Sequence, residues 1–177
     1  MNVVLSPRIS ALHRELGIPP GYADERRLAL QPEISADELV DIGQNPDGSS
    51  VLLAKPAAAA WFDLHRAAAK DGIELLPISG FRSVDRQVEI VGEKVAGRQP
   101  LAEILRTVAA PGFSEHHTGR ALDIGSPEDV ELDEDFARTT AFGWLERHAA
   151  QFGFRLSYPR DNPHGIGYEP WHWCWHR

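Results

Sequence analysis

Residues 114–123 carry side chains that suit metal chemistry, and they read S-x-H-x-x-G-x-A-x-D. His116 and Asp123 lie seven positions apart, which is too far for their side chains to share one helical turn. They converge only if the chain folds back between them, and Gly119 is the residue at which it can do so. Asp123 itself lies in a short strand-like stretch, residues 120–124. An imidazole and a carboxylate brought together suit a divalent metal ion, with zinc the first candidate.

A third ligand is available near the C-terminus, where the sequence E-P-W-H contains His172. A metal held by three protein ligands keeps a fourth position for water and can lower the pKa of that water to about 7. The predicted ligands are His116, Asp123 and His172, which leaves Glu169 free to act as the general base. On an extended strand, residues 169 and 172 point to opposite faces. Glu169 therefore reaches the metal only if the backbone turns at Pro170, or if Glu169 lies in the loop before the strand.

Arg82 is a further functional candidate, in a segment that reads S-G-F-R-S from Ser79 to Ser83. Its guanidinium can neutralise charge that grows on a scissile carbonyl oxygen, or hold a substrate carboxylate through two parallel hydrogen bonds. Together the three segments resemble the D-Ala-D-Ala carboxypeptidases of the VanY type, whose corresponding motif S-G-[YF]-R-S-x-x-x-Q is completed here by Gln87. That family belongs to the zinc peptidase group that also contains lysostaphin-like enzymes and the hedgehog signalling domain.

The resemblance covers roughly residues 50–174. It implies an α+β fold with a small central antiparallel sheet flanked by helices, and one zinc ion in a groove on the sheet. It places the general base at Glu169. It also implies that Gln87 and Ser114 help Arg82 to hold the terminal carboxylate of a peptide substrate.

The residue pattern independently favours an antiparallel α+β fold, because short strands and helices mix without a βαβ rhythm. By its length the chain is a single domain over residues 1–177. We expect a catalytic core at 51–177, preceded by an extension, 1–50, to which the sequence assigns no role. Helices are predicted from Pro7 to Leu16, from Pro56 to Gly72, after Ser83, over 101–108 and from Thr139 to Gly153; strands are predicted at 39–42, 51–53, 73–79, 154–156 and 171–175.

Composition restricts the partners of the chain. The formal net charge of -8 disfavours nucleic acid and an anionic membrane surface. The resemblance implies a small peptide substrate derived from peptidoglycan, and we expect a monomer. No stretch approaches the roughly 20 apolar residues of a membrane span, and the N-terminus lacks the features of a secretory signal. If Met1 is the natural start, the expected location is the cytoplasm.

The sequence also makes predictions for several side chains near the candidate ligands. Cys174, the only cysteine, lies two residues beyond His172 and can share its strand face, but a small buried residue is the preferred interpretation. His117 is expected to point away from the metal. Four aromatic residues are expected to shape the groove, namely Tyr158, Tyr168, Trp171 and Trp173.

The sequence is compatible with four functions. The leading one is a zinc carboxypeptidase that removes the C-terminal residue from peptidoglycan-derived peptides containing D-amino acids, with D,D, L,D or dipeptide specificity undecided. An endopeptidase of the same group, which cuts L-Ala-D-Glu, would not need residues that hold the free terminal carboxylate of a substrate. Two histidines and a carboxylate also form the facial triad of non-haem iron oxygenases, which need no base such as Glu169. An inactive metal-holding module would have no use for Glu169 and Arg82.

Overall fold

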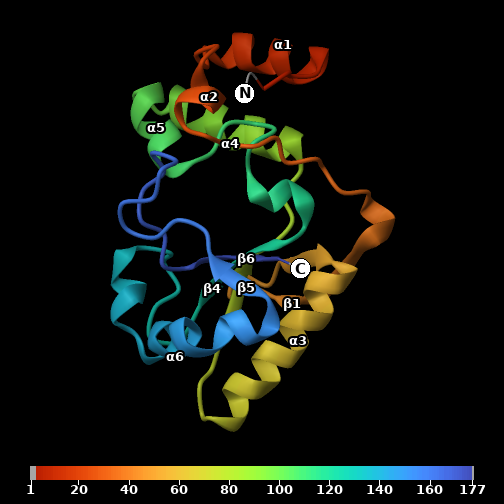
Figure 1. The fold of residues 1–177 in the computed structure, drawn as a ribbon, viewed down its shortest axis with the longest axis vertical. Coiled ribbons are helices and arrows are strands. Elements are labelled where there is room, and N and C mark those ends of the chain that lie inside the picture. The colour runs from red at the N-terminus through yellow and green to blue at the C-terminus, as the bar shows by residue number, and fades with distance from the viewer. Residues whose placement is uncertain (1–2, 177) are drawn as a thin grey trace.

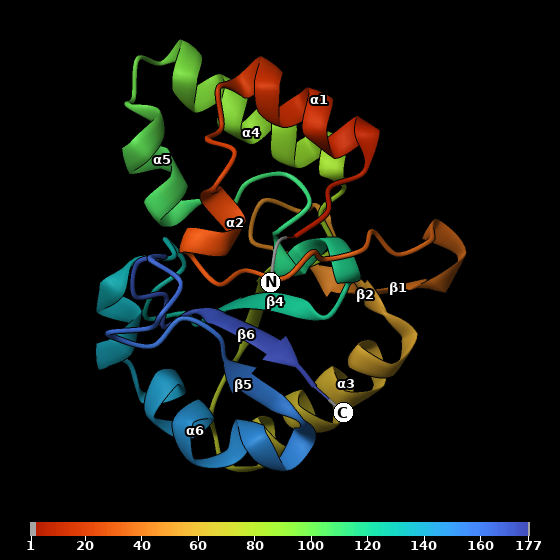
Figure 2. The ribbon, with the colours of Figure 1, turned by 45° about the horizontal axis from the view of Figure 1, so that its top comes forward.

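A four-stranded antiparallel sheet forms the centre of the computed structural model, which describes residues 3–176. Its strands follow the order β3 (Leu76–Ser79), β4 (Ala121–Gly125), β6 (His172–Trp175) and β5 (Phe154–Leu156). Helices cover both faces of this sheet (Figures 1 and 2). The α+β class with a small central antiparallel sheet, predicted from the sequence, is therefore confirmed.

Helices α3 (Lys55–Lys70) and α6 (Thr140–His148) pack against one face of the sheet (Figure 2). Leu122 and Trp173, which are paired across β4 and β6, both belong to the apolar core on this side. Because successive side chains of a strand point to opposite faces, the neighbours of these two residues point to the other face. That other face carries the candidate metal ligands.

The strands predicted at 39–42 and 51–53 are present as β1 (Leu39–Gln44) and β2 (Ser50–Ala54), which pair as a hairpin and form a separate two-stranded sheet. The backbone of β2 lies close to the segment that follows β3, where Phe81 N–H donates to the Leu52 carbonyl at 2.7 Å. A Cβ atom at Gly80 would come within 2.3 Å of the same carbonyl oxygen, so only glycine fits. This close approach fixes the position of the S-G-F-R-S segment.

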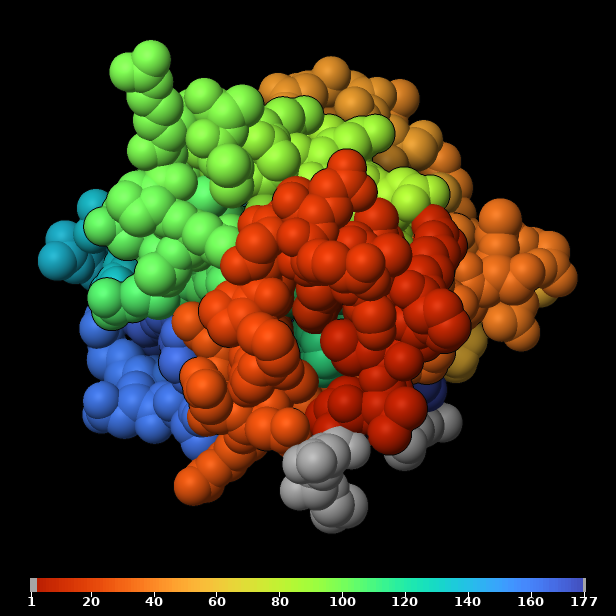
Figure 3. Space-filling model, turned by 90° about the horizontal axis from the view of Figure 1, so that it is seen from above, coloured from red at the N-terminus to blue at the C-terminus, as the bar shows by residue number. Residues whose placement is uncertain are grey.

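Four helices lie over the face of the sheet that carries the candidate ligands (Figure 2). Helices α4 (Val84–Ala96) and α5 (Leu101–Thr107) come from the middle of the chain. The N-terminal helices α1 (Pro7–Leu16) and α2 (Tyr22–Glu25) pack beside them and cover the middle of the molecule when it is seen from above (Figure 3). The Ser6 hydroxyl caps α1 and Gly17 ends it in the left-handed region, so α1 has the bounds that were predicted from the sequence.

The N-terminal residues share a second apolar cluster with the rest of the chain. Tyr22 and Leu28 are buried there against Leu105 of α5 and against Phe113. The Tyr22 hydroxyl also accepts a hydrogen bond from the Ala110 N–H at 3.1 Å. The extension to which the sequence assigned no role thus packs against the segment that leads into the candidate site.

The remaining elements are 3₁₀ turns, η1 (Ala36–Glu38), η2 (Glu115–Thr118), η3 (Glu134–Arg138) and η4 (Ala149–Phe152). The helix predicted to end at Gly153 is therefore α-helical only to His148 and tightens into η4 for its last turn. Among the described residues, no helix is both long enough and apolar enough to cross a membrane.

Candidate metal centre and active site

His116 lies in η2, directly before β4. The turn ends at Gly119, whose φ of 65° lies in the left-handed region that favours glycine. A Cβ atom at Gly119 would also come within 2.9 Å of the backbone nitrogen of Ala54. The chain reverses here and enters β4, and the reversal brings His116 back to Asp123, as the spacing of the motif predicted.

Asp123 and His172 are direct partners across the β4–β6 pair. Asp123 Oδ1 lies 3.0 Å from His172 Nδ1, and Asp123 Oδ2 lies 3.3 Å from His116 Nε2. Each carboxylate oxygen therefore faces one imidazole nitrogen. All three side chains are buried, with no residue more than 4% exposed. We call these three residues the metal centre.

Hydrogen bonds behind the two rings decide which nitrogens carry protons. Nδ1 of His116 lies 2.6 Å from the Gly80 carbonyl oxygen, which can only accept. This nitrogen is therefore the donor, and Nε2 presents its lone pair to Asp123. Nε2 of His172 lies 2.9 Å from Oε2 of the Glu115 carboxylate, to which it donates. Nδ1 of His172 is left facing Asp123.

Two imidazole lone pairs and a carboxylate cannot face one another without a cation between them. Burial alone would lower the pKa of His172, but its hydrogen bonds with Asp123 and Glu115 outweigh burial and raise that pKa to about 10. Burial would likewise raise the pKa of Asp123, yet the two histidines hold it well below its usual range. A proton on His172 thus supplies the required positive charge in the metal-free protein.

Zinc can take the place of that proton. The ligand atoms of His116, Asp123 and His172 lie within 4.8 Å of one another. Two imidazoles and one carboxylate are a donor set that catalytic zinc sites use. The expected cofactor, one zinc ion, therefore fits the metal centre.

Glu115 is a functional residue that the sequence analysis missed. Its Oε2 accepts hydrogen bonds from His172 Nε2 and, at 2.6 Å, from the Ser157 hydroxyl. Burial would raise the pKa of Glu115, but these partners lower it to about 2, so the carboxylate is ionised. A carboxylate behind a histidine ligand fixes the orientation and the tautomer of the ring. Glu115 occupies a free position of the motif, and its partner lies 57 residues away, so spacing along the chain gave no signal.

Glu169 meets the geometric condition set by the sequence. Strand β6 begins only at His172, and the backbone turns before it, with the His172 N–H donating to the Glu169 carbonyl at 3.1 Å. The turn brings Glu169 Oε2 to 3.9 Å from His172 Nδ1, the nitrogen that faces the metal centre. Burial raises the pKa of Glu169 to about 7. A carboxyl group in this position can both accept and return a proton near neutral pH.

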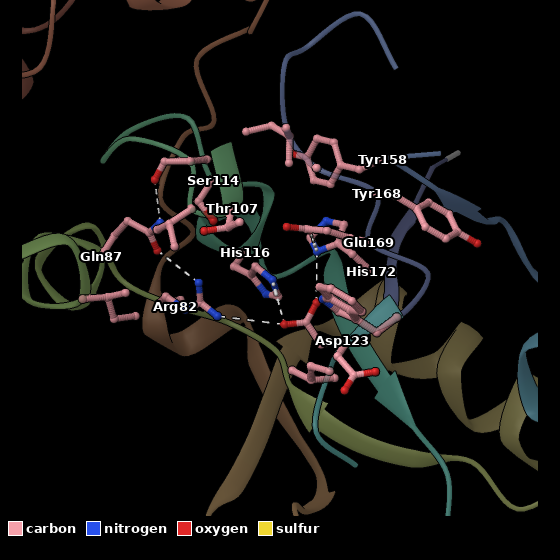
Figure 4. A pocket seen from close by; sticks show the side chains of 18 of the residues that line it. Arg82, Gln87, Thr107, Ser114, His116, Asp123, Tyr158, Tyr168, Glu169 and His172 are labelled. Carbon is pink, nitrogen blue, oxygen red and sulfur yellow. Dashed lines mark hydrogen bonds and ion pairs between the residues drawn. The ribbon is translucent and has the colours of Figure 1, made fainter. Parts of the chain in front are cut away.

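Arg82 lies between the metal centre and helix α4 (Figure 4). Its Nη2 donates to the Ser79 hydroxyl at 3.1 Å and lies 4.0 Å from Asp123 Oδ2. Its Nη1 donates to the Gln87 side-chain oxygen at 3.2 Å. The guanidinium also lines the central cavity, with 21% of the side chain exposed. The hydrogen bonds with Ser79 and Gln87 hold the guanidinium in place, and its exposed part remains accessible to an anionic ligand.

Gln87 and Ser114 line the same cavity, but they differ in their partners. Gln87 donates to the Ala109 carbonyl at 2.6 Å and accepts from Arg82, which leaves one N–H of its amide for a ligand. Ser114 is 4% exposed, and no hydrogen bond involves its hydroxyl among the described residues. The structure thus brings the three predicted substrate-binding residues to one wall of the cavity.

His117 points away from the metal centre, as expected, and it is fully buried. Its Nδ1 donates to the Arg82 carbonyl at 2.7 Å, and its Nε2 accepts from the Gly112 N–H at 3.1 Å. The adjacent Arg82 N–H donates to the His116 carbonyl at 3.2 Å. These bonds tie the Arg82 backbone to the turn that carries His116, so that the guanidinium and the metal centre keep a fixed spacing.

The metal centre opens into a cavity of about 520 Å³. Tyr158, Tyr168 and Trp171 line this cavity, as the sequence predicted. The prediction for Trp173 is wrong, because its side chain lies in the apolar core beneath the sheet. It follows His172 directly on β6, so the alternation of the strand turns it to the opposite face.

Comparison with known proteins identifies the family. Residues 50–177 match the family described as VanY: D-alanyl-D-alanine carboxypeptidase. The protein YodJ of Bacillus subtilis (strain 168) is 32% identical over 169 residues, which are 93% of this chain and 58% of YodJ. The structure of the LdcB LD-carboxypeptidase is similar with a TM-score of 0.72 and 32% identity, over 80% of this chain and 69% of that one. A mutant of the vancomycin resistance D,D-pentapeptidase VanY in complex with Zn(II) is similar with a TM-score of 0.60 and 28% identity, over 85% of this chain and 87% of that one.

The chain therefore belongs to the VanY family of D-alanyl-D-alanine carboxypeptidases, in agreement with its three motifs. Zinc is bound by a structural neighbour of the same family, which agrees with the donor set of the metal centre. The chain spans between 41% and 66% of the length of the curated relatives that it matches. The family match begins at the first residue of β2, whereas the similarity to YodJ also includes most of the N-terminal extension.

Proposed function

We propose that this chain is a zinc-dependent carboxypeptidase that removes the C-terminal residue from peptidoglycan-derived peptides containing D-amino acids. One observation carries the proposal. A three-ligand metal centre, a buried carboxylate that is not needed as a ligand, and a guanidinium all meet in a single cavity. The similarity to an LD-carboxypeptidase and to a D,D-pentapeptidase supports the substrate class.

Glu169 is the proposed general base and acid. Zinc in the metal centre supplies the chemistry of a Lewis acid, which polarises the scissile carbonyl and acidifies water. Glu169 takes one proton from the attacking water and delivers it to the nitrogen of the departing amino acid, so the proton balance closes. Its pKa of about 7 suits both steps, because both the ionised and the protonated form of Glu169 are populated near neutral pH.

Arg82, Gln87 and Ser114 form what we call the carboxylate clamp. In the proposed binding mode, the guanidinium pairs with the terminal carboxylate of the substrate, while the Ser114 hydroxyl and the free Gln87 N–H complete its hydrogen bonds. The pairing would place the last peptide bond of the substrate beside the metal centre. The clamp thus selects substrates by their free C-terminus.

An endopeptidase is the second candidate, and one feature of the cavity favours it. The cavity continues along α4 beyond Gln87, where Ile90 and Lys94 line it. This space can receive a further substrate residue. The response to a free or a blocked terminus, together with the position of the cleaved bond, separates the two activities.

The experiment uses matched stem peptides. Zinc-loaded protein is incubated with tetrapeptide and pentapeptide stems, each with a free and with an amidated C-terminus, and the products are weighed by mass spectrometry. We expect loss of one terminal residue from the free acids and kcat/KM lower by about 100-fold on the amides, because amidation removes the charge that Arg82 pairs with. Which stem loses its D-alanine also assigns L,D or D,D specificity. Equal rates on free and amidated stems, or internal cleavage, would move the endopeptidase to first place.

A further inference from the structure

A second group of potential metal ligands lies on the same strand face as His172. Side chains two residues apart on a strand share a face, so His172 is followed on β6 by Cys174 and, just past the strand, by His176. Glu115 reaches toward these two residues from η2. Ligand atoms of Glu115, Cys174 and His176 all lie within 4.8 Å of one another.

The surroundings of this second group are well defined. Cys174 is 1% exposed and is held between Ala121 of β4 and Arg155 of β5 in the sheet. The backbone of His176 is fixed by an N–H that donates to the Gly153 carbonyl at 2.8 Å. The sheet therefore places Cys174 and the backbone of His176, while hydrogen bonds with His172 and Ser157 hold the Glu115 carboxylate.

Access to the second group does not pass through the catalytic cavity. A separate cavity of about 300 Å³ is lined by Glu115 and His176. Among the described residues, Tyr158 is the only one that lines both cavities. A small cation can therefore approach Glu115 and His176 through this cavity. Cys174 does not line the cavity, but its sulfur lies within 4.8 Å of ligand atoms of both residues.

We propose that Glu115, Cys174 and His176 form a second binding site for a thiophilic divalent metal ion such as Zn²⁺ or Cd²⁺. Thiolate, imidazole and carboxylate together match the ligand preferences of these ions. On binding, the Cys174 sulfur forms a bond to the metal and its proton leaves to solvent. The thiolate and the Glu115 carboxylate then balance the two positive charges of the ion.

This site is coupled to the metal centre through Glu115. The carboxylate that would bind the second ion already accepts hydrogen bonds from His172 and Ser157. A cation on Glu115 withdraws negative charge from the bond that orients His172, and a weaker bond loosens the catalytic ligand. Occupation of the second site therefore slows turnover, a consequence that rests on the proposed carboxypeptidase function.

Cys174 is the only cysteine of the chain, so a thiolate–metal absorption band reports on this site alone. Protein that holds one zinc ion per chain is titrated with Cd²⁺ while the ultraviolet thiolate-to-metal charge-transfer band is followed. We expect a saturable band at one Cd²⁺ per chain, with the catalytic zinc still bound by metal analysis. His176→Ala should weaken Cd²⁺ binding at least about tenfold, since it removes one of three ligands. His65→Ala removes an exposed histidine far along the chain and should leave the titration unchanged.

Two results would overturn the assignment of the site: no thiolate band in the folded, zinc-loaded protein, or a band of equal affinity in His176→Ala. The coupling is tested on stem-peptide hydrolysis, where turnover should fall along the same Cd²⁺ curve in the wild type but not in Cys174→Ser. A saturated band with unchanged turnover would contradict the coupling. A chain that cleaves no stem peptide at all would contradict the proposed function and leave the spectroscopic result to decide the site.

Discussion

The metal centre and the carboxylate clamp share one cavity, but the protein holds them in different ways. The ligands of the centre are at most 4% exposed, and a backbone carbonyl, a cross-strand pairing and the half-buried carboxylate of Glu115 fix them. In the clamp, the Arg82 side chain is 21% exposed and its partners are the side chains of Ser79 and Gln87. The sheet therefore sets the geometry of the centre before any ligand binds. The clamp depends on side-chain hydrogen bonds that a substrate carboxylate can replace.

This difference implies that a substitution in the metal centre abolishes turnover, whereas a substitution in the clamp changes which substrate is used.

Asp123→Asn should have the largest effect. The amide keeps the shape of the carboxylate but loses the charge that both imidazoles face, so zinc should be lost. We expect kcat to fall at least about 10⁴-fold, since a catalytic metal contributes several kcal/mol to the transition state. Zinc content by plasma mass spectrometry and kcat should fall together; a variant that keeps zinc and turnover would contradict the assigned ligand.

Glu169→Gln should separate metal binding from catalysis. The substitution preserves shape and removes the proton acceptor, so kcat should fall by about 10³-fold, within the range that a positioned acid–base group contributes. Zinc content should stay at one ion per chain. Turnover close to that of the wild type with zinc bound would show that another residue moves the proton.

Arg82→Lys should act on substrate selection instead of metal binding. Lysine keeps the charge but cannot form the planar pair with a carboxylate, so kcat/KM on free-acid stems should fall by about 10²-fold. On amidated stems, wild type and variant should be nearly equal. Arg86→Lys is the matched control, because Arg86 is an exposed arginine on α4, the helix that follows Arg82, and it pairs with Glu89. An equal loss on free and amidated stems would mean that Arg82 acts on the reaction and does not read the terminus.

Glu115→Gln should give the smallest effect, and it should appear in metal affinity. A neutral amide is a weaker acceptor for His172, and loss of such a partner behind a ligand typically weakens metal binding by about 10–100-fold. Competition with a zinc chelator measures this, and kcat at saturating zinc should recover most of the wild-type value. Glu146→Gln, at an exposed position, serves as the control. Unchanged zinc affinity would mean that the register of the sheet alone positions His172.

The sequence predicted the three ligands of the metal centre, but it did not predict the residue that holds one of them in place. The fold-back at Gly119 and the two strands that carry Asp123 and His172 were predicted from the sequence, whereas the pairing of these strands is known only from the structure. Glu115 was not predicted, because its role depends on a partner 57 residues away. Side-chain contacts between distant segments leave no periodicity that a single sequence reveals.

Two other outcomes show where local patterns fail. Trp173 was expected in the groove because it lies in the same short segment as Trp171, but strand alternation from His172 turns it into the core. The stretch around Tyr22 and Leu28 reads as mixed and polar, yet both side chains are buried. Their apolar partners come from other segments, so tertiary packing decides their position.

The central claim is that zinc is held by His116 Nε2, a carboxylate oxygen of Asp123 and His172 Nδ1, with Glu169 beside it and unbound. Crystals of protein purified without added metal, measured by anomalous diffraction at the zinc edge, test this directly. We predict a strong peak at roughly 2.0–2.2 Å from these three atoms. Iron at the site, a bond from the metal to Glu169, or binding through Nε2 of His172 would contradict the account.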